Sequence, residues 1–563
     1  MRLSPLTKGL PNWKNAALAL LGAILLILAF PDFDCWFLAW FALVPLMWAV
    51  EREKESTSRS VLVGWIFGTA FFFGTCWWLT YAPITYAGFP PIVAYLLFFC
   101  VAAVAGLFPA MFAGVLSALL RRFGSVAMLA APFVWVATEF LRYWVTGNNW
   151  NALGYSQAFG GQMVQWSSIG GVLLTSFIVL IPGTIFLRIY SSPLWEDAKY
   201  HYRLIFSTWE WGWLSAEKSK PTKRLNSHTM AFYVILVPLI LILTYSFFAT
   251  ISSLLVPSKP TNSDSGSNVV AIQPNVPMSG LTYEKWQELR RRHVGLAESA
   301  LANSRENLRS EISNSKSVVI FPESPMNFMY ETDAETREFI DGFVRRNDVS
   351  VIFNSAEPDA DGKFFNSAVM VGPQGGEIAQ YDKIYLLPFG ESVPAPLRAI
   401  VPAFVGSFSY GSEYDLLPLG DAKAGVMICF ESHFGELSRE YVRNGADVLI
   451  EMTNDGYLGP TPVLRQHLAN AVFRAAETNR PVLRVTNVGI TTYINERGQV
   501  LDPAQAYSED TRVWSVSKSD GSQTLYVRWG DWFAWVCLAV TAGLLIAGFR
   551  RRKIITDSSA ISA

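Results

Sequence analysis

The chain has 563 residues, of which 51% are hydrophobic and only 16% are charged, and its formal net charge is −1. Soluble domains usually contain about 25% charged residues, so this composition predicts that a large part of the chain lies in lipid. The near-zero net charge gives no support for a nucleic-acid partner. The five cysteines form neither a Cys-x-x-Cys pair nor a cluster with histidine. This argues against zinc and iron–sulfur sites, and we expect no metal and no cofactor.

Eight apolar runs are long enough to approach a bilayer span, which needs about 20 residues. The second run is short, and the fourth is long enough to tilt or break. No small-residue cleavage site follows the first run, so we expect a retained helix rather than a signal peptide. The predicted spans are 13–30, 36–50, 61–82, 92–120, 126–145, 163–189, 230–256 and 532–549.

The loops between these runs alternate in charge. Lysine and arginine cluster before the first run, after the second, fourth and sixth runs, and after the last run. The intervening loops 31–35, 83–91 and 146–162 contain neither residue. The positive-inside rule then places both termini in the cytoplasm and the large insert between the last two runs on the opposite side. In a bacterium that side is the periplasm or the cell exterior.

This pattern predicts three parts of the chain. Residues 1–256 form a membrane domain with seven spans, 257–531 form an extracytoplasmic domain, and 532–563 contain the eighth span and a basic cytoplasmic tail. The polar stretch 257–268 is typical of a flexible linker.

Some residues of the membrane part have two interpretations. Glu139 and Arg142 lie three residues apart on one predicted helix. They can be a buried functional pair, or they can reach the headgroups from a helix end. Trp and Tyr crowd the ends of the spans, as is typical of an interfacial belt. Trp150 is the one among them that we single out as a candidate substrate contact.

The extracytoplasmic part alternates short β-branched runs with helical stretches, which predicts an α/β domain. The alternation does not indicate whether there is one sheet or two. The glycine-rich stretch 372–376 predicts a hairpin, and the helix at 463–480 is expected to turn its polar face outward. The predicted strands are 269–273, 318–321, 351–354, 367–371, 377–381, 425–428, 448–452, 482–485 and 491–495, and the predicted helices are 282–304, 334–346, 434–444 and 463–480.

Polar residues follow three of these strands, at the positions where α/β proteins usually build their sites. Glu323 and the pair Asn454 and Asp455 each follow a strand, and Cys429, the only cysteine of the extracytoplasmic part, ends another. Lys383 lies on the loop after the hairpin. A carboxylate can take the thiol proton, while an ammonium can lower the thiol pKa and stabilise an oxyanion. In the alternative interpretation, the thiol is a small buried hydrophobe and the charged residues form a structural ion pair.

Three sequence strings, in this order, resemble the Glu–Lys–Cys motifs of the nitrilase superfamily. They are Phe-Pro-Glu-Ser at 321–324, Lys383 ahead of Leu-Pro-Phe-Gly-Glu at 387–391, and Ile-Cys-Phe-Glu at 428–431. Their fusion to membrane-length helices narrows the resemblance to the bacterial apolipoprotein N-acyltransferase family. The resemblance covers nearly the whole chain, apart from 191–229 and the C-terminal tail. Further matching strings are 136–142, 153–157, 453–455, 466–467, 474–477 and 486–489.

The resemblance implies a fold and a set of roles. The fold would be an αββα sandwich joined to a polytopic α-helical membrane domain of about eight helices. Glu323 would be the general base, Lys383 the oxyanion stabiliser and Cys429 the nucleophile. The supporting positions would be Glu391, Phe430, Glu431 and Asn366, together with Trp150 as a substrate contact.

Three positions depart from the family pattern. Phe430 stands where the family often has Tyr, and Tyr385 stands where His or Arg often follows the lysine by two residues. The stretch 147–150 reads Gly-Asn-Asn-Trp in place of Gly-Phe-Pro-Trp. Because none of them belongs to the triad, they bear on lipid or acceptor preference and not on the reaction class.

The resemblance implies transfer of a fatty acyl chain from a phospholipid to the α-amine of the N-terminal S-diacylglyceryl-cysteine of a lipoprotein, through a thioester on Cys429. The expected partners are these two substrates and the membrane lipids, with no nucleic acid. The expected location is the bacterial inner membrane, and the expected state is a monomer. Two alternatives stay open: a membrane-tethered nitrilase-type amidase or hydrolase, and a catalytically inactive membrane scaffold.

Overall fold

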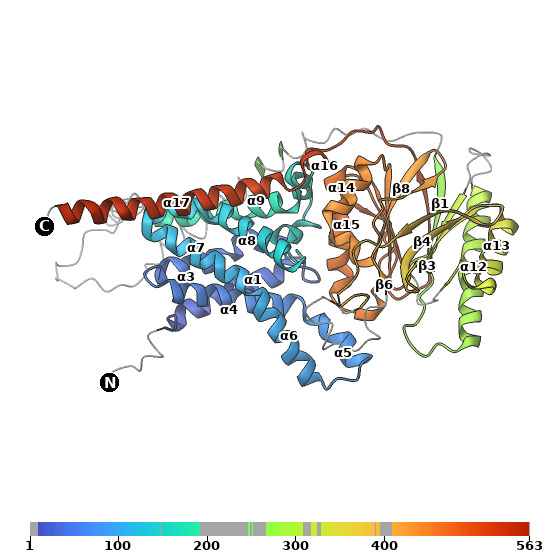
Figure 1. Ribbon diagram of the computed structural model, residues 1–563, viewed down its shortest axis with the longest axis horizontal. Coiled ribbons are helices and arrows are strands. Elements are labelled where there is room, and N and C mark those ends of the chain that lie inside the picture. Colours follow the sequence, from blue (N-terminus) through green and yellow to red (C-terminus); the bar gives the residue numbers. More distant parts are fainter. Residues whose placement is uncertain are drawn as a thin grey trace, which may run out of the picture.

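The computed structural model places a bundle of helices at one end of the molecule and the β-strands at the other (Figure 1). The predicted span 230–256 lies outside the described residues apart from four positions, and so does most of the predicted linker 257–268. The described residues are 9–147, 149–191, 246–247, 250–251, 266–307, 317–323, 328–388, 390–393 and 408–561.

The first part of the chain and the last helix form the bundle. Small residues let these helices approach closely. A Cβ added at Gly64 would lie 2.4 Å from the carbonyl oxygen of Pro109, and one at Gly68 would lie 2.8 Å from the Cα of Gly106. The helices are α1 (Trp13–Ala29), α2 (Ala39–Ala42), α3 (Val44–Glu53), α4 (Thr57–Thr75), α5 (Tyr81–Thr85), α6 (Pro91–Ala105), α7 (Leu107–Phe123), α8 (Ala131–Thr146), α9 (Ser167–Tyr190) and α17 (Trp532–Ile561).

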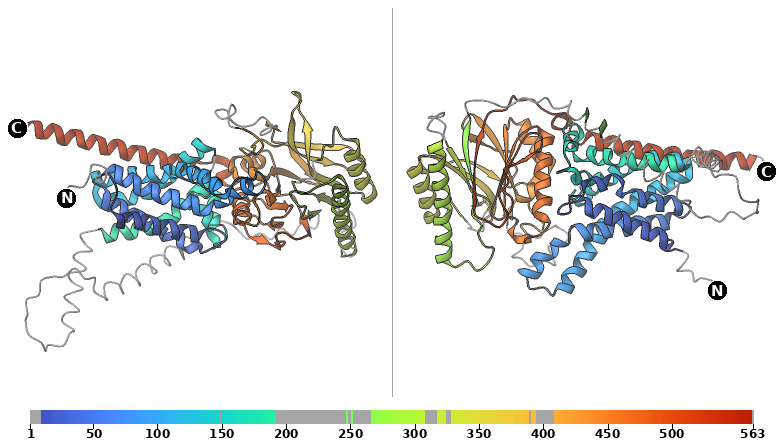
Figure 2. Two further views of the ribbon diagram at one scale, coloured as in Figure 1. Left: turned by 90° about the horizontal axis from the view of Figure 1, so that it is seen from below. Right: turned by 180° about the vertical axis from the view of Figure 1, so that it is seen from behind.

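Two of the predicted spans are bent or divided. The run 92–120 divides at Gly106 into α6 and α7, and α6 leans away from the bundle (Figures 1 and 2). In the run 61–82, α4 and the stretch Trp77–Thr85 are bent by 62°. The total of eight spans therefore stays a prediction. Among the described residues, three helical segments are long and apolar enough to cross a membrane: Pro91–Thr146, which contains α6, α7 and α8, Gln162–Tyr190 and Trp532–Arg550. The bent pair is a fourth if it is taken as one span.

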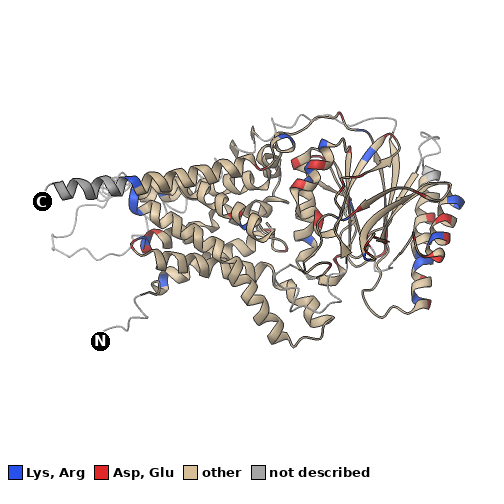
Figure 3. Ribbon diagram, viewed as in Figure 1, with Lys and Arg blue, Asp and Glu red and all other residues tan. Residues whose placement is uncertain are grey.

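Charged residues are sparse along the middle of the bundle (Figure 3). Lys and Arg gather at the end that lies away from the strands. Arg52 lies in the last turn of α3, and Arg121 and Arg122 lie in the last turn of α7. This distribution is typical of helices whose sides face lipid and whose basic ends face the cytoplasm.

The α/β unit contains two sheets, which answers the question that strand periodicity left open. The strands are β1 (Ser267–Gln273), β2 (Ser317–Ile320), β3 (Ser350–Pro358), β4 (Phe364–Val371), β5 (Glu377–Asp382), β6 (Phe408–Ser409), β7 (Leu416–Leu419), β8 (Ala422–Ile428), β9 (Val448–Thr453), β10 (Val482–Thr486), β11 (Thr492–Ile494), β12 (Val500–Leu501) and β13 (Asp510–Val516). The first sheet has the order β13-β1-β2-β3-β4-β5, with β6 paired to β4. The second has the order β12-β11-β10-β9-β8-β7.

Helices cover the outer face of each sheet, which gives the layers α, β, β and α (Figures 1 and 2). Because side chains alternate along a strand, β1 contributes to two cores. Its Val270 and Ile272 pack with α12 (Tyr283–Asn307) and α13 (Ala334–Asn347), whereas Val269 and Ala271 belong to the core that includes the second sheet. The outer face of the second sheet is covered by α14 (Gly435–Arg443) and α15 (Val463–Thr478).

Every strand and helix predicted for this unit occurs close to its expected bounds, and the hairpin at 372–376 joins β4 to β5. The strands β6, β7, β12 and β13 and the helix α16 (Leu525–Trp529) were not predicted. Two of these strands have only two residues each, which is too short for a periodic signal.

The prediction that the helix at 463–480 turns its polar face outward is wrong. Every residue of α15 except Arg465 is buried. The helix lies between the second sheet and the bundle (Figure 1), so a side that is polar in sequence faces other protein and not water. Its polar side chains must therefore find partners inside the molecule.

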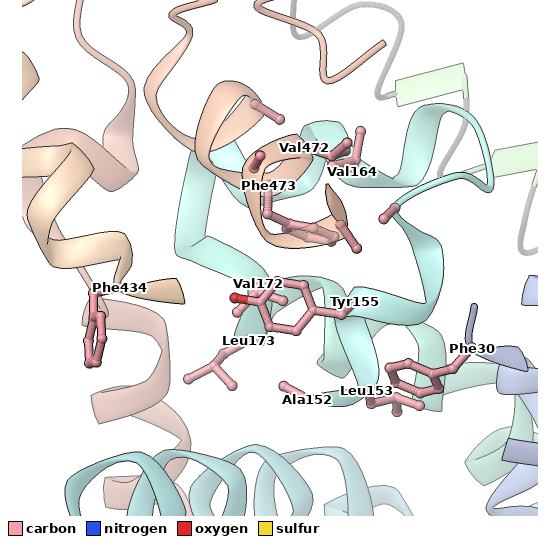
Figure 4. Packing of buried hydrophobic residues seen from close by; sticks show 14 of the residues in the cluster. Phe30, Ala152, Leu153, Tyr155, Val164, Val172, Leu173, Phe434, Val472 and Phe473 are labelled. Atoms are coloured by element: carbon pink, nitrogen blue, oxygen red, sulfur yellow. The ribbon is translucent and has the colours of Figure 1, made fainter. Parts of the chain in front are cut away.

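Apolar and polar contacts seat the α/β unit on the bundle. Figure 4 shows Phe473 of α15 against Tyr155 of the bundle, and the two ring centroids lie 5.0 Å apart. Helix α9 is interrupted at Gly170 and Gly171, whose backbone is not helical. The backbone N–H of Val172, just after this break, donates to Glu477 Oε1 of α15 at 2.9 Å.

Candidate active site

Residues from the ends of both sheets meet at one place. Glu323 comes three residues after β2, and Lys383 directly follows β5, both from the first sheet. Cys429 directly follows β8 of the second sheet, and Asn454 directly follows β9. Cys429 has a φ of +53°, a left-handed conformation that costs a residue with a side chain about 1–3 kcal/mol and is often found at functional sites.

The three residues that the sequence proposed as a triad lie together. The Nζ of Lys383 lies 2.8 Å from Glu391 Oε1 and 3.8 Å from Glu323 Oε1. Cys429 lies close enough to both residues for the charges of Glu323 and Lys383 to shift the pKa of its thiol. The lysine is 1% exposed, and the two carboxylates are 16% and 14% exposed. One ammonium is thus shared by two carboxylates next to the thiol.

Neutral donors hold the carboxylates in place. Asn366 Nδ2 donates to Glu391 Oε1 at 2.6 Å and to Glu323 Oε1 at 3.2 Å. Its own Oδ1 accepts from Asn354 Nδ2 at 2.6 Å. The second oxygen of Glu323 accepts from the backbone N–H of Asn454 at 3.1 Å. Asn366 therefore fixes the distance between the two acids.

The site raises the pKa values of the Cys429 thiol and of the Glu323 carboxylate. Burial raises the pKa of Glu323 against the opposing charge of Lys383. Burial and the neighbouring Glu323 raise the pKa of Cys429 well above its ordinary value, and they outweigh the lowering effect of Lys383. The expectation that the ammonium lowers the thiol pKa holds for its own contribution but not for the net result. A buried thiol beside a carboxylate needs that carboxylate as a base.

The charge of the ammonium is secured by its neighbours. Burial disfavours the charged form of Lys383, but Glu391 and Glu323 outweigh burial and raise its pKa above the usual value. Burial alone would raise the pKa of Glu391, yet Lys383 and the backbone N–H of Leu387 lower it. The Glu391–Lys383 pair is therefore ionised at neutral pH.

Glu431 joins the cysteine turn to the lysine loop. Its Oε2 accepts from the backbone N–H of Ile428 at 2.8 Å. Its Oε1 accepts from the backbone N–H groups of Ile384 at 2.7 Å and Tyr385 at 3.0 Å, and from the hydroxyl of Tyr381 at 2.7 Å. Burial raises its pKa to about 7. The residues next to Cys429 and to Lys383 are thus fixed to a single carboxylate.

Phe430 and Trp150 lie to one side of the triad, around His433. The ring of His433 is stacked with Phe430 at a centroid distance of 5.7 Å and with Trp150 at 5.4 Å. Tyr385 stacks on Phe434 at 4.1 Å. Two of the three departures from the family pattern are thus aromatic contacts beside the nucleophile, while Asn148 of the third lies outside the described residues.

Glu139 and Arg142 are both buried, and they brace the loop that carries Trp150. Glu139 Oε1 accepts from the backbone N–H of Leu153 at 2.8 Å. Arg142 donates to the carbonyl of Trp150 at 2.8 Å and to Asn149 Oδ1 at 3.2 Å. Because both side chains are buried and bind protein groups, the contacts favour a buried structural role for both residues.

A second group of charges, which the sequence prediction missed as a group, lies behind Cys429. Arg484 contacts Glu451 at 2.5 Å and Asp455 at 2.8 Å. His467 Nδ1 lies 2.7 Å from Asp455 Oδ1, and its Nε2 lies 3.0 Å from the carbonyl oxygen of Cys429. The sequence offered one signal for this group, a single charged residue within each of two otherwise apolar strands. These residues, Arg484 and Glu451, are register partners on β10 and β9.

These contacts shift the pKa values strongly. Burial opposes the charge on His467, but Asp455 and Glu451 outweigh it and raise the pKa to about 9. Burial would likewise raise the pKa of Glu451, yet Arg484 and His467 lower it to about 2. At neutral pH the group therefore contains an ionised Glu451 paired with Arg484 and a charged His467 in contact with Asp455.

Tyr457 of the α/β unit is half exposed, and its ring lies 6.3 Å from that of Tyr86 of the bundle. Phe389, in the loop after Lys383, lies outside the described residues. Among the residues that the structure describes, no group of three or more His, Cys, Asp or Glu side chains could hold a metal ion.

Known protein families match both the helical part and the α/β part of the chain. Residues 22–185 match the family model of the apolipoprotein N-acyltransferase N-terminal domain, and residues 292–525 match that of carbon-nitrogen hydrolase. An apolipoprotein N-acyltransferase from Geobacter metallireducens is 29% identical over 96% of this chain and 96% of its own length. One from Photobacterium profundum is 27% identical over 90% of this chain and 89% of its own.

A solved structure of an amidase from Nesterenkonia sp. is similar to the α/β unit, with 16% identity, a TM-score of 0.33, and coverage of 46% of this chain and 94% of the amidase. The two family models match in order, and the relatives span both the helical and the α/β parts. The chain belongs to the apolipoprotein N-acyltransferase family of the nitrilase superfamily.

Proposed function

We propose that this protein transfers a fatty acyl chain from a phospholipid to the α-amine of the N-terminal S-diacylglyceryl-cysteine of a lipoprotein. The observation that carries this proposal is the meeting of Glu323, Lys383 and Cys429 at the sheet ends of a chain that also contains membrane-length apolar helices. Both substrates are lipids, so a bilayer anchor raises their concentration at the site.

The first half-reaction forms a thioester. The Sγ of Cys429 attacks the ester carbonyl of the phospholipid while its proton passes to Glu323. Lys383 stabilises the negative charge that develops on the carbonyl oxygen. The carbon–oxygen bond then breaks, Glu323 returns the proton to the departing oxygen, and a lysophospholipid leaves. The raised pKa values of Cys429 and Glu323 support this order, because a buried thiol keeps its proton until a base of raised pKa accepts it.

The second half-reaction uses the same groups. The lipoprotein amine attacks the thioester carbonyl and gives a proton to Glu323. The carbon–sulfur bond breaks, and the sulfur of Cys429 recovers its proton from Glu323. The product is an amide, which is more stable than a thioester, so no nucleotide is required.

The supporting residues act on the triad through the contacts already described. Glu391 keeps Lys383 charged, and Asn366 holds the two carboxylates at a fixed separation. Glu431 fixes the backbone on both sides of the site. Phe430 and Trp150, with the histidine between them, form an aromatic wall suited to a lipid chain.

The proposal includes an orientation. Eight spans, with 257–531 in the periplasm and both termini in the cytoplasm, are supported by the basic residues at the end of the bundle opposite the strands (Figure 3). A periplasm-only reporter fused at Asn303 should be active, and one fused at Lys218 should be silent. The reverse pattern would contradict this orientation.

The test of the reaction is incubation of the purified protein with phospholipid and a diacylated lipoprotein. We expect a triacylated product and one lysophospholipid for each product formed. Release of free fatty acid with no triacylated product would instead indicate a hydrolase. Failure to form either product with any phospholipid would favour an inactive scaffold.

A further inference from the structure

Helix α15 connects the bundle to the nucleophile through two adjacent side chains. Gln466 is 3% exposed and extends into the bundle. The Oε1 of its amide accepts hydrogen bonds from the bundle, and the Nε2 donates to it. The hydrogen bonds run to Gln466 Oε1 from Trp150 Nε1 at 3.0 Å, Trp78 Nε1 at 3.1 Å and Asn151 Nδ2 at 3.4 Å, and from Gln466 Nε2 to the carbonyls of Thr75 at 2.9 Å and Pro31 at 3.3 Å.

These partners come from three separate segments of the bundle. Pro31 follows α1, Thr75 and Trp78 lie at the end of α4 and just beyond it, and the remaining two belong to the loop at 149–152. A single neutral side chain therefore fixes three segments to one point on α15. Removal of its amide would leave the buried indole N–H of Trp78 without that acceptor, and unpaired buried donors are unfavourable.

The next residue of the helix faces the other way. Successive residues of an α-helix are about 100° apart around the axis, so His467 can reach the second sheet while Gln466 faces the bundle. His467 Nε2 contacts the carbonyl oxygen of Cys429 at 3.0 Å. Asp455 at 2.7 Å and Glu451 at 3.1 Å hold the imidazole ring. The carbonyl that it contacts belongs to the residue with the left-handed backbone.

We propose that Gln466 and His467 form a positioning pair, in which the seating of α15 on the bundle sets the orientation of Cys429. The proposal rests on the proposed acyl transfer and adds to it two residues that act through Cys429 without touching the substrate. The bundle then does more than anchor the α/β unit, because its contacts with Gln466 determine where His467 places the nucleophile.

A purely structural role makes a different prediction. If Gln466 only helps the protein fold, its loss lowers the amount of folded protein but leaves the folded molecules fully active. If it positions Cys429, correctly folded molecules react slowly. Small displacements of a reacting group can lower rates by about 100-fold.

The experiment uses the full-length protein in lipid nanodiscs, with labelled phospholipid and no lipoprotein. The rate of lysophospholipid release reports acylation of Cys429, the KM reports phospholipid binding, and the melting temperature reports folding. The variants are Gln466→Leu, His467→Leu and His467→Gln, whose amide can still donate to the carbonyl of Cys429. We expect the two leucine variants to acylate at least about tenfold more slowly with little change in KM, and His467→Gln to recover part of the rate.

The matched control is Arg465→Gln. Arg465 also joins α15 to the bundle, since it pairs with Asp34 and lies over the ring of Phe159 at 4.7 Å. Its side chain is 36% exposed, and the contacts just named are with Asp34 and Phe159 rather than with the charged groups around Cys429. We expect this variant to acylate within about twofold of wild type, as surface ion pairs contribute little.

A milder variant covers the case in which Gln466→Leu does not fold. Trp78→Phe removes one donor to Gln466 from the bundle side, and we expect a smaller but measurable loss of rate. Combined with His467→Gln, it should give a loss that differs from the sum of the two single effects, because both act on one helix. Strict additivity, or a Gln466→Leu protein that folds and acylates within about twofold of wild type, would overturn the proposal.

A second readout separates this proposal from the proposed function. Alkylation of Cys429 by iodoacetamide requires no lipid and no acyl transfer. If wild-type protein releases no lysophospholipid, the proposed function fails, while the alkylation rates still test the pair. Altered alkylation rates in the leucine variants, with Arg465→Gln unchanged, would support positioning, and equal rates in all variants would contradict it.

Discussion

Two buried charge groups lie next to Cys429, and the pKa values of their glutamates are shifted in opposite directions. In the group on the first sheet, the Lys383 ammonium lies 2.8 Å from Glu391 and 3.8 Å from Glu323, and burial raises the pKa of Glu323. On the second-sheet side, Glu451 has Arg484 at 2.5 Å and His467 at 3.1 Å, and its pKa is lowered to about 2. The number and distance of the cations, rather than burial alone, decide the sign of each shift.

The opposite pKa shifts of Glu323 and Glu451 indicate that the first group is suited to proton transfer and the second to holding the structure in place. A carboxylate with a raised pKa can take and return a proton near neutral pH. A carboxylate whose pKa is about 2 stays ionised and can only hold its partners. Changes to the first group should therefore lower the rate in a folded protein, whereas changes to Arg484 or Glu451 of the second group should mainly lower stability.

Lys383→Met has the largest expected effect on rate. It removes the shared ammonium at roughly constant chain length, and loss of one oxyanion stabiliser typically lowers the rate by about 10²–10³-fold. The melting temperature should change far less than the rate. The matched control is Lys423→Met, which changes an exposed lysine on β8 and should leave the rate unaltered. Near-normal turnover of Lys383→Met would show that the lysine is only an ion-pair partner.

Arg484→Met should act mainly on stability. It leaves Glu451 and Asp455 buried without their strongest partner, and breaking a buried pair on one side costs about 3–5 kcal/mol of unfolding free energy. Thermal unfolding in detergent measures the loss, with Arg443→Met on the exposed side of α14 as the control. A stable but inactive Arg484→Met protein would erase the distinction between the two groups.

The two groups should also respond differently to pH. Because the pKa of Glu323 is raised above its ordinary 4.5, acylation should be lost as the pH falls through that higher value. The pKa of His467 is raised from 6.5 to about 9, so its stabilising contribution is complete below about pH 6.5 and is lost as the pH rises through about 9. The difference in melting temperature between wild type and His467→Gln should therefore shrink by a few degrees over this interval.

If the difference in melting temperature is constant from pH 6.5 to 9, His467 does not titrate in this range. Asp455, Glu451 and Arg484 are the charged groups that face its ring. Asp455→Asn, which removes one of the anions that hold the imidazolium, should shift the transition to lower pH. An unchanged transition in this variant would show that another group titrates.

Local patterns predicted much of the fold. The predicted strands of the α/β unit and the hairpin at 372–376 depend on neighbours in sequence, and they occur close to where they were expected. The burial of α15 could not be predicted this way. Its amphipathic pattern does not reveal that the bundle covers the side opposite the sheet.

The sequence proposed individual residues of the site, but it did not reveal the neighbouring charges that set their pKa values. Glu451 and Arg484 lie side by side because of the register of two parallel strands, which no single segment of the sequence reveals. The net pKa of Cys429 depends on its burial, so the expected lowering by Lys383 was outweighed. The side chain of Gln466 contacts residues up to 435 positions away, and only the assembled fold brings them together.

The central claim is that Cys429 carries the acyl group between the two substrates, and intact mass measurement tests it most directly. Wild-type protein given phospholipid but no lipoprotein should gain the mass of one acyl chain, and neutral hydroxylamine should remove it. Glu323→Gln should gain it slowly, and Cys429→Ala should not gain it. If wild-type protein turns over with a lipoprotein present, yet no acyl group is trapped on Cys429 when the acceptor is withheld, the covalent mechanism is contradicted.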